Sequence, residues 1–104
     1  MEKIVKQGLL YDFYGALLND HQRGIYEAVV YDNMSLSEIA SEHGISRQGV
    51  HDLIKRCDKS LEEYENRLHL VEKFLAIREE VENIERLAES DNIKALAAKI
   101  LEQL

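Results

Sequence analysis

The sequence predicts an all-α protein: a helix-turn-helix bundle followed by a long amphipathic helical extension. The 104 residues include no proline and only five glycines, and good helix formers dominate the composition. Apolar residues recur at steps of three and four along most of the chain, which indicates amphipathic helices. A central segment also combines two helix starts with a glycine turn, the pattern of two short helices meeting at a fixed angle.

The length is that of one structural unit, long enough to bury a single core. Within it we expect a helix-turn-helix head over residues 1–60 and an amphipathic tail over residues 61–104. The head begins with a helix over residues 3–18, because its apolar residues keep helical spacing. Asn19-Asp20 is a short connection with Asp20 as the expected cap. A second helix over residues 21–31 then ends at the Asp32-Asn33 turn signal.

Residues 35–56 carry the helix-turn-helix pattern. Ser35 and Glu38 form a capping box that starts one helix. Ala40 is small where the two helices should cross, and Gly44 tolerates the left-handed conformation that ends a helix. Ser46 then caps a second helix. The agreement of these positions predicts a compact two-helix elbow.

The second helix of the motif separates apolar from polar side chains. Val50, Leu53 and Ile54 form its inner face, and Ile45 packs inside the turn. Gly49 is a weakness, since glycine within a helix costs about 1 kcal/mol relative to alanine. The polar side chains left outside are Arg47, Gln48, His51, Asp52 and Lys55. A recognition helix that enters a groove of nucleic acid has this arrangement. The alternative is a plain helical hairpin without a ligand.

The tail continues the amphipathic pattern. Leu61, Tyr64, Leu68, Val71 and Leu75 step by three and four, close to heptad spacing. Either the second motif helix runs straight through Ser60, or Ser60 caps a new helix. Ser90-Asp91-Asn92 is a break, and a last short helix follows from Ile93. The apolar stripe covers the helices of residues 3–31, pairs with a second chain in a homodimer, or does both.

The charge distribution limits how tightly the motif can bind an anionic partner. The formal net charge is −7, with four cations and four anions in residues 35–60 and six cations against eleven anions in residues 61–104. Phosphate neutralisation supplies much of the affinity for nucleic acid. The cations near this exposed polar face are Arg47, Lys55, Arg56 and Lys59. We therefore expect weak, salt-sensitive binding by one copy and stronger binding by a dimer.

Several other classes of protein lack support in the sequence. The lone Cys57 excludes an internal disulfide and fits a reducing cytoplasm. We expect no signal peptide and no membrane span, because no long apolar run occurs. No spacing of His, Cys or acidic residues indicates a metal site or a nucleophile–base pair. No glycine-rich phosphate loop occurs. We expect neither an enzyme nor a cofactor.

Several segments together resemble known families. Residues 17–23, Ser35 to Ala40 and Ile45 to Gln48 resemble region 4 of bacterial sigma factors, which reads promoter DNA. The chain is still more similar to the YlxM family of helix-turn-helix proteins, whose continuation resembles Ile54-Lys55-Arg56, Leu61 to Glu65 and Leu68 to Phe74. Gly49 stands where that resemblance leads us to expect alanine.

The resemblance implies a sigma-like head that meets nucleic acid through Arg47, Gln48, His51, Asp52 and Lys55, with Arg56 and Lys59 as further cations nearby. It also implies a part in the signal recognition particle pathway. Two hypotheses follow. In the first, the chain is a regulator that binds DNA or RNA through the motif. In the second, it is an accessory factor that binds the particle's RNA or protein, without sequence-specific DNA binding. The acidic segment over residues 79–89 favours a basic protein partner.

Overall fold

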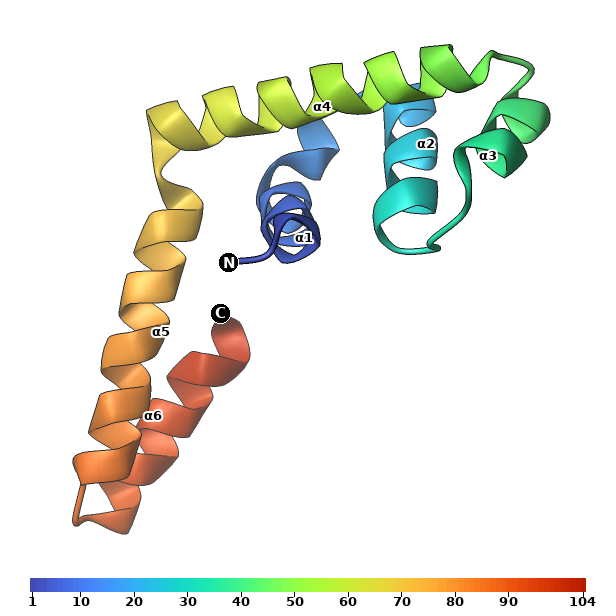
Figure 1. Ribbon diagram of the computed structural model, residues 1–104. Coiled ribbons are helices and arrows are strands. Elements are labelled where there is room, and N and C mark those ends of the chain that lie inside the picture. The colour runs from blue at the N-terminus through green and yellow to red at the C-terminus, as the bar shows by residue number, and fades with distance from the viewer. The chain divides into compact units, whose positions relative to one another are not determined.

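The computed structural model describes residues 1–104 and contains helices without strands (Figure 1). The prediction of an all-α fold is therefore confirmed. The elements in chain order are α1 (Lys3–Tyr14), a 3-10 turn (Gly15–Leu17), α2 (Asp20–Val30), α3 (Leu36–His43), α4 (Arg47–Leu68), α5 (Leu70–Leu87) and α6 (Asp91–Gln103). They form two compact units, Met1–Leu68 and His69–Leu104. The division falls after Leu68, later than the boundary expected after residue 60.

The first unit is built on α4. Helices α1, α2 and α3 all pack against it (Figure 1). Its most deeply buried side chains come from all four helices and are Tyr14, Ile25, Tyr26, Ile39, Val50, Cys57 and Leu61. One long helix thus carries both the second half of the elbow and the surface on which the first two helices pack.

Polar bonds inside this unit link α4 to the amino-terminal helices. The Tyr26 hydroxyl donates to Asp58 at 2.6 Å, and the Gln7 amide donates to both oxygens of the same carboxylate at 3.0 and 3.1 Å. The Tyr14 hydroxyl donates to Glu65 at 2.6 Å. Every buried side-chain nitrogen and oxygen has a hydrogen-bond partner, so the polar groups within the core are compensated.

The amino-terminal region differs in detail from the prediction. The α-helix ends at Tyr14 and tightens into the 3-10 turn, instead of continuing to residue 18. The cap of α2 is Asn19, so the expectation of Asp20 was wrong. Asn19 accepts from the Gln22 backbone N–H at 2.8 Å, and the Gln22 side chain accepts from the Asn19 N–H at 3.0 Å. Asp20 is instead the first residue of the helix, where its negative charge interacts favourably with the positive end of the helix dipole.

The alternative at Ser60 is settled by the structure, because α4 continues through it to Leu68. The interruption comes at His69, which has a φ of 56° in the left-handed region. Its ring nitrogen Nδ1 lies 3.1 Å from Glu72 at the start of α5. A non-glycine residue rarely adopts this backbone conformation, which explains why helical spacing alone did not locate the break.

The second unit is a hairpin of α5 and α6 (Figure 1). Its turn lies at residues 88–90, and α6 begins directly after Ser90, close to the predicted break. Val81 and Ala97 are buried. Several large apolar side chains remain about half-exposed or more: Ile77, Ile84, Leu87, Ile93, Leu96 and Ile100. Neither this unit nor the first contains a helix long and apolar enough to cross a lipid bilayer.

Candidate nucleic-acid interface

The first helix of the elbow begins at a complete capping box. The Ser35 hydroxyl accepts from the Glu38 backbone N–H at 3.1 Å, and the Glu38 carboxylate accepts from the Ser35 N–H at 3.3 Å. Ile39 and Ala40 are the buried residues of α3. Ala40 is thus a small side chain on the face that packs against α4, as the sequence predicted.

The turn is made by Gly44, which has a φ of 65°. Its N–H and that of Ile45 both donate to the Ala40 carbonyl, which closes α3. Nothing lies within 4 Å of the position that a Cβ on Gly44 would occupy, so the backbone conformation alone favours glycine there. Ile45 is half-buried.

Ser46 caps α4, as predicted. Its hydroxyl accepts from the Gly49 backbone N–H at 2.9 Å. A Cβ on Gly49 would lie 3.2 Å from the same hydroxyl oxygen. Gly49 therefore leaves space for the cap, which gives a local reason for the departure from alanine.

The predicted site residues all lie on α4 and are exposed. Arg47, Gln48, His51, Asp52, Lys55, Arg56 and Lys59 are solvent-accessible, and we call this set the recognition face. At about 100° per residue they occupy roughly half of the helix circumference. On the inner side Val50 and Leu53 are buried and Ile54 is half-buried. Residues 35–56 therefore form two helices joined by a turn, and the polar side of the second helix is exposed to solvent.

The recognition face has a different charge from the motif as a whole. It carries four cations and one carboxylate, Asp52. Of the other three acidic residues in residues 35–60, Glu38 and Glu42 lie on α3, and Asp58 is partly buried among Gln7 and Tyr26. The neutral sum over residues 35–60 thus conceals a face of α4 with net positive charge.

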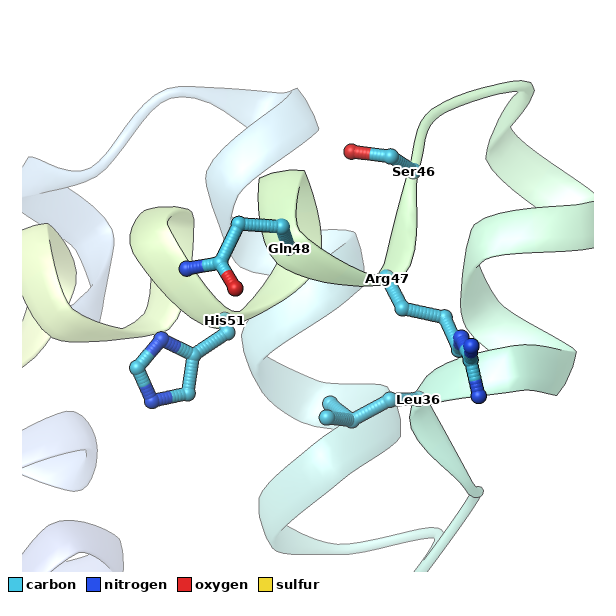
Figure 2. A pocket seen from close by; sticks show the side chains of 5 residues that line it. All are labelled: Leu36, Ser46, Arg47, Gln48 and His51. Carbon is cyan, nitrogen blue, oxygen red and sulfur yellow. The ribbon is translucent and has the colours of Figure 1, made fainter.

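An open pocket of about 540 Å³ lies in the elbow. Figure 2 shows Arg47, Gln48 and His51 projecting from the first turns of α4, with Leu36 from the start of α3 and Ser46 from the turn. A second, more apolar pocket of about 320 Å³ shares Leu36 and His51 and extends to Ile4 and Val29. Leu36, which the sequence analysis did not single out, is 39% exposed and lines both pockets.

Three side chains of the recognition face interact with one another. The Gln48 amide nitrogen donates to Asp52 Oδ1 at 2.9 Å. His51 Nδ1 lies 3.6 Å from the same oxygen. The spacing of four residues between Gln48 and Asp52 is a known pairing distance on helices, and this signal could have revealed the bond from the sequence.

Cys57 and His43 lie outside the recognition face. Cys57 is fully buried, and this burial raises the pKa of its thiol to about 11, which suppresses the nucleophilic thiolate. His43 is exposed, with its ring centre 6.0 Å from that of His21. No group of three or more His, Cys, Asp or Glu side chains is arranged to hold a metal ion.

The capped elbow, its glycine turn and the exposed polar face of α4 define a helix-turn-helix protein. Comparison with known proteins identifies the group more narrowly. Residues 1–103 match the family described as "Putative helix-turn-helix protein, YlxM / p13 like", and the chain belongs to this family, UPF0122. The resemblance to YlxM proteins is thereby confirmed.

Several bacteria have relatives of this chain that belong to the same family. A UPF0122 protein of Shouchella clausii is 35% identical over the whole chain and 95% of the relative. One of Streptococcus gordonii is 43% identical over 81% of this chain and 76% of the relative. One of Caldanaerobacter subterraneus subsp. tengcongensis is 51% identical over 73% of this chain, but the match spans 65% of that relative, slightly under two thirds.

Proposed function

We propose that this protein binds nucleic acid through the recognition face of α4 and acts as a regulator. One observation carries the proposal: seven polar side chains stand exposed on one side of the second helix of the elbow, with four cations among them. In helix-turn-helix proteins this helix enters the major groove. Arg47 and Lys55 would contact phosphates or guanine, and Gln48 has the donor and acceptor that pair with adenine.

The test is a fluorescence anisotropy titration with labelled duplex DNA of random sequence, and in parallel with the RNA of the signal recognition particle, each at several salt concentrations. Each phosphate contact contributes about −0.9 to the slope of log affinity against log salt for duplex DNA. Arg47→Ala and Lys55→Ala should each weaken binding and reduce this slope by about one. Lys99→Ala removes the same charge from an exposed position on α6 and is the matched control.

Equal affinity and equal slope in all three variants would refute binding through α4. If the particle's RNA binds and the duplex does not, the recognition face acts on RNA shape instead of base sequence in a groove.

A second candidate is an accessory role in the signal recognition particle pathway through a basic protein partner. It is supported by the exposed carboxylates of Glu79 and Glu80 on α5, whereas the neighbouring Glu82 is paired with Arg78 at 3.3 Å. Charge complementarity of this kind accelerates association. Co-purification of the particle's protein component at low salt should be lost with Glu79→Lys/Glu80→Lys and kept with Arg47→Ala. No retention by the unmodified protein would reject this role.

We further infer that two copies associate through the second unit. Ile77 and Ile84 are seven residues apart on α5 and 48% exposed, which is the spacing of a helix-packing seam. A dimer would present two recognition faces to one nucleic acid. Sedimentation should show a dimer that Ile77→Glu/Ile84→Glu converts to a monomer. Leu17→Glu alters an apolar residue of the first unit that is 58% exposed and should leave the dimer intact.

A further inference from the structure

Asp52 is the unexpected member of the recognition face. A carboxylate repels the phosphate groups on which sequence-independent binding depends. It is also the only acidic side chain among the seven, and it lies between Gln48 and His51 on one side and Lys55 on the other along the exposed face of α4. A surface selected only for tight binding to nucleic acid would not place a negative charge at this position.

The hydrogen bond from Gln48 gives Asp52 a second effect. A carboxylate can only accept hydrogen bonds, so the carboxamide of Gln48 must turn its nitrogen toward Asp52 Oδ1, 2.9 Å away. The oxygen of the carboxamide then points elsewhere and remains an acceptor. The second N–H of the same group remains a donor. This pair is what a glutamine uses to recognise adenine, and its orientation is set before binding.

Resting on the proposed function, we propose that Asp52 is a positioning residue that determines specificity. It orients the carboxamide of Gln48 for base recognition and weakens binding to sequences that offer only phosphates. Specificity is a difference between affinities, and a repulsive group that acts on every sequence raises it when the correct site compensates. The partner class is duplex nucleic acid with adenine among the bases that α4 contacts.

The experiment uses the full chain and a pool of labelled DNA duplexes with a randomised central segment. Anisotropy with the whole pool measures sequence-independent affinity, and sequencing of the bound fraction measures base preference. Asp52→Asn should tighten binding to the pool by roughly threefold to tenfold and steepen the salt slope by up to about one. It should also reduce the enrichment of adenine, because an asparagine amide lets Gln48 turn either way.

Two further variants separate these effects. Gln48→Ala should lose the adenine enrichment without tighter binding to the pool. Glu42→Gln removes one negative charge from an exposed position on α3 and should change neither quantity as much as Asp52→Asn does. Circular dichroism verifies that all variants keep their helical content.

The outcomes distinguish this inference from the function on which it rests. If the unmodified protein binds the pool and Asp52→Asn matches Glu42→Gln in affinity and enrichment, the role of Asp52 is refuted and nucleic-acid binding stands. If neither the unmodified protein nor Asp52→Asn binds the DNA pool at low salt, the role of Asp52 in duplex recognition is refuted. Nucleic-acid binding is refuted as well if the titration with the particle's RNA is also negative. Tighter binding by Asp52→Asn with unchanged enrichment refutes the positioning of Gln48.

Discussion

The Tyr26 hydroxyl donates a hydrogen bond of 2.6 Å to the carboxylate of Asp58, which joins α2 to the middle of α4. The tyrosine side chain is completely buried, and Asp58 lies one position after the buried Cys57. Because α4 also carries the recognition face, this bond links the packing of the amino-terminal helices to the helix that presents the candidate site. The two residues are 32 positions apart in the sequence.

Tyr26→Phe should destabilise the first unit by about 1–3 kcal/mol, since it removes a hydrogen bond to a charged group and leaves the ring in place. Asp58 keeps the Gln7 amide as a donor, so the loss should fall short of unfolding the chain. Urea denaturation followed by circular dichroism measures the change. Tyr64→Phe is the matched control, because it removes a hydroxyl from another tyrosine of the same unit, half-buried on α4, and keeps the ring beside Tyr14. Equal stability of the two variants would contradict the importance of the Tyr26–Asp58 bond.

Stability should fall as the pH rises above about 9–10. Burial, followed by hydrogen bonding to Asp58, raises the pKa of Tyr26 above its ordinary value of 10.0. Burial likewise raises the pKa of Cys57 from 9.0 to about 11. These groups hold their protons more tightly when folded, so their contribution is complete below the unfolded pKa and is lost as the pH rises toward the folded pKa. Urea unfolding at about pH 7 and about pH 10.5 measures the difference, which Tyr26→Phe should reduce. A flat profile over this range would contradict the raised pKa values.

The sequence predicted much of the helical fold because its signals are local. The Ser35–Glu38 capping box, the left-handed Gly44 and the Ser46 cap each depend on residues within one turn of the chain. Helical spacing also predicted that Val50 and Leu53 are buried while the polar side chains of α4 are exposed. These positions form the framework of the candidate site.

What could not be predicted depends on contacts between distant residues or on rare backbone conformations. The bonds from Gln7 and Tyr26 to Asp58 join residues 51 and 32 positions apart. No helical periodicity reports such a pair. The break at His69 follows a left-handed conformation that only a few per cent of non-glycine residues adopt. The two caps Asn19 and Asp20 are both acceptable to local rules, and only the bonds with Gln22 identify Asn19.

Gly44→Ala should destabilise the protein by about 1–2 kcal/mol, because an L side chain is strained in the left-handed region. The φ of 65° and the open space around the position make this a test of backbone conformation alone. Gly24→Ala is the matched control. Gly24 lies within α2, and a Cβ there also meets nothing within 4 Å, so alanine should stabilise by up to about 1 kcal/mol. Thermal unfolding of both variants measures whether each substitution raises or lowers stability. If both stabilise or both destabilise, the explanation is contradicted.

The Ser46 cap and Gly49 should be energetically coupled. Ser46→Ala removes the acceptor for the Gly49 N–H and should cost about 1 kcal/mol. Gly49→Ala gains up to about 1 kcal/mol of helix propensity, but its Cβ would lie 3.2 Å from the Ser46 hydroxyl oxygen, which must shift. Alanine at position 49 should therefore stabilise more when residue 46 is also alanine, since the crowded oxygen is then absent. Urea unfolding of the two single variants and the double variant measures this difference as a coupling energy. Strict additivity would show that the close approach carries no cost, and Gly49 would then have no role in preserving the cap.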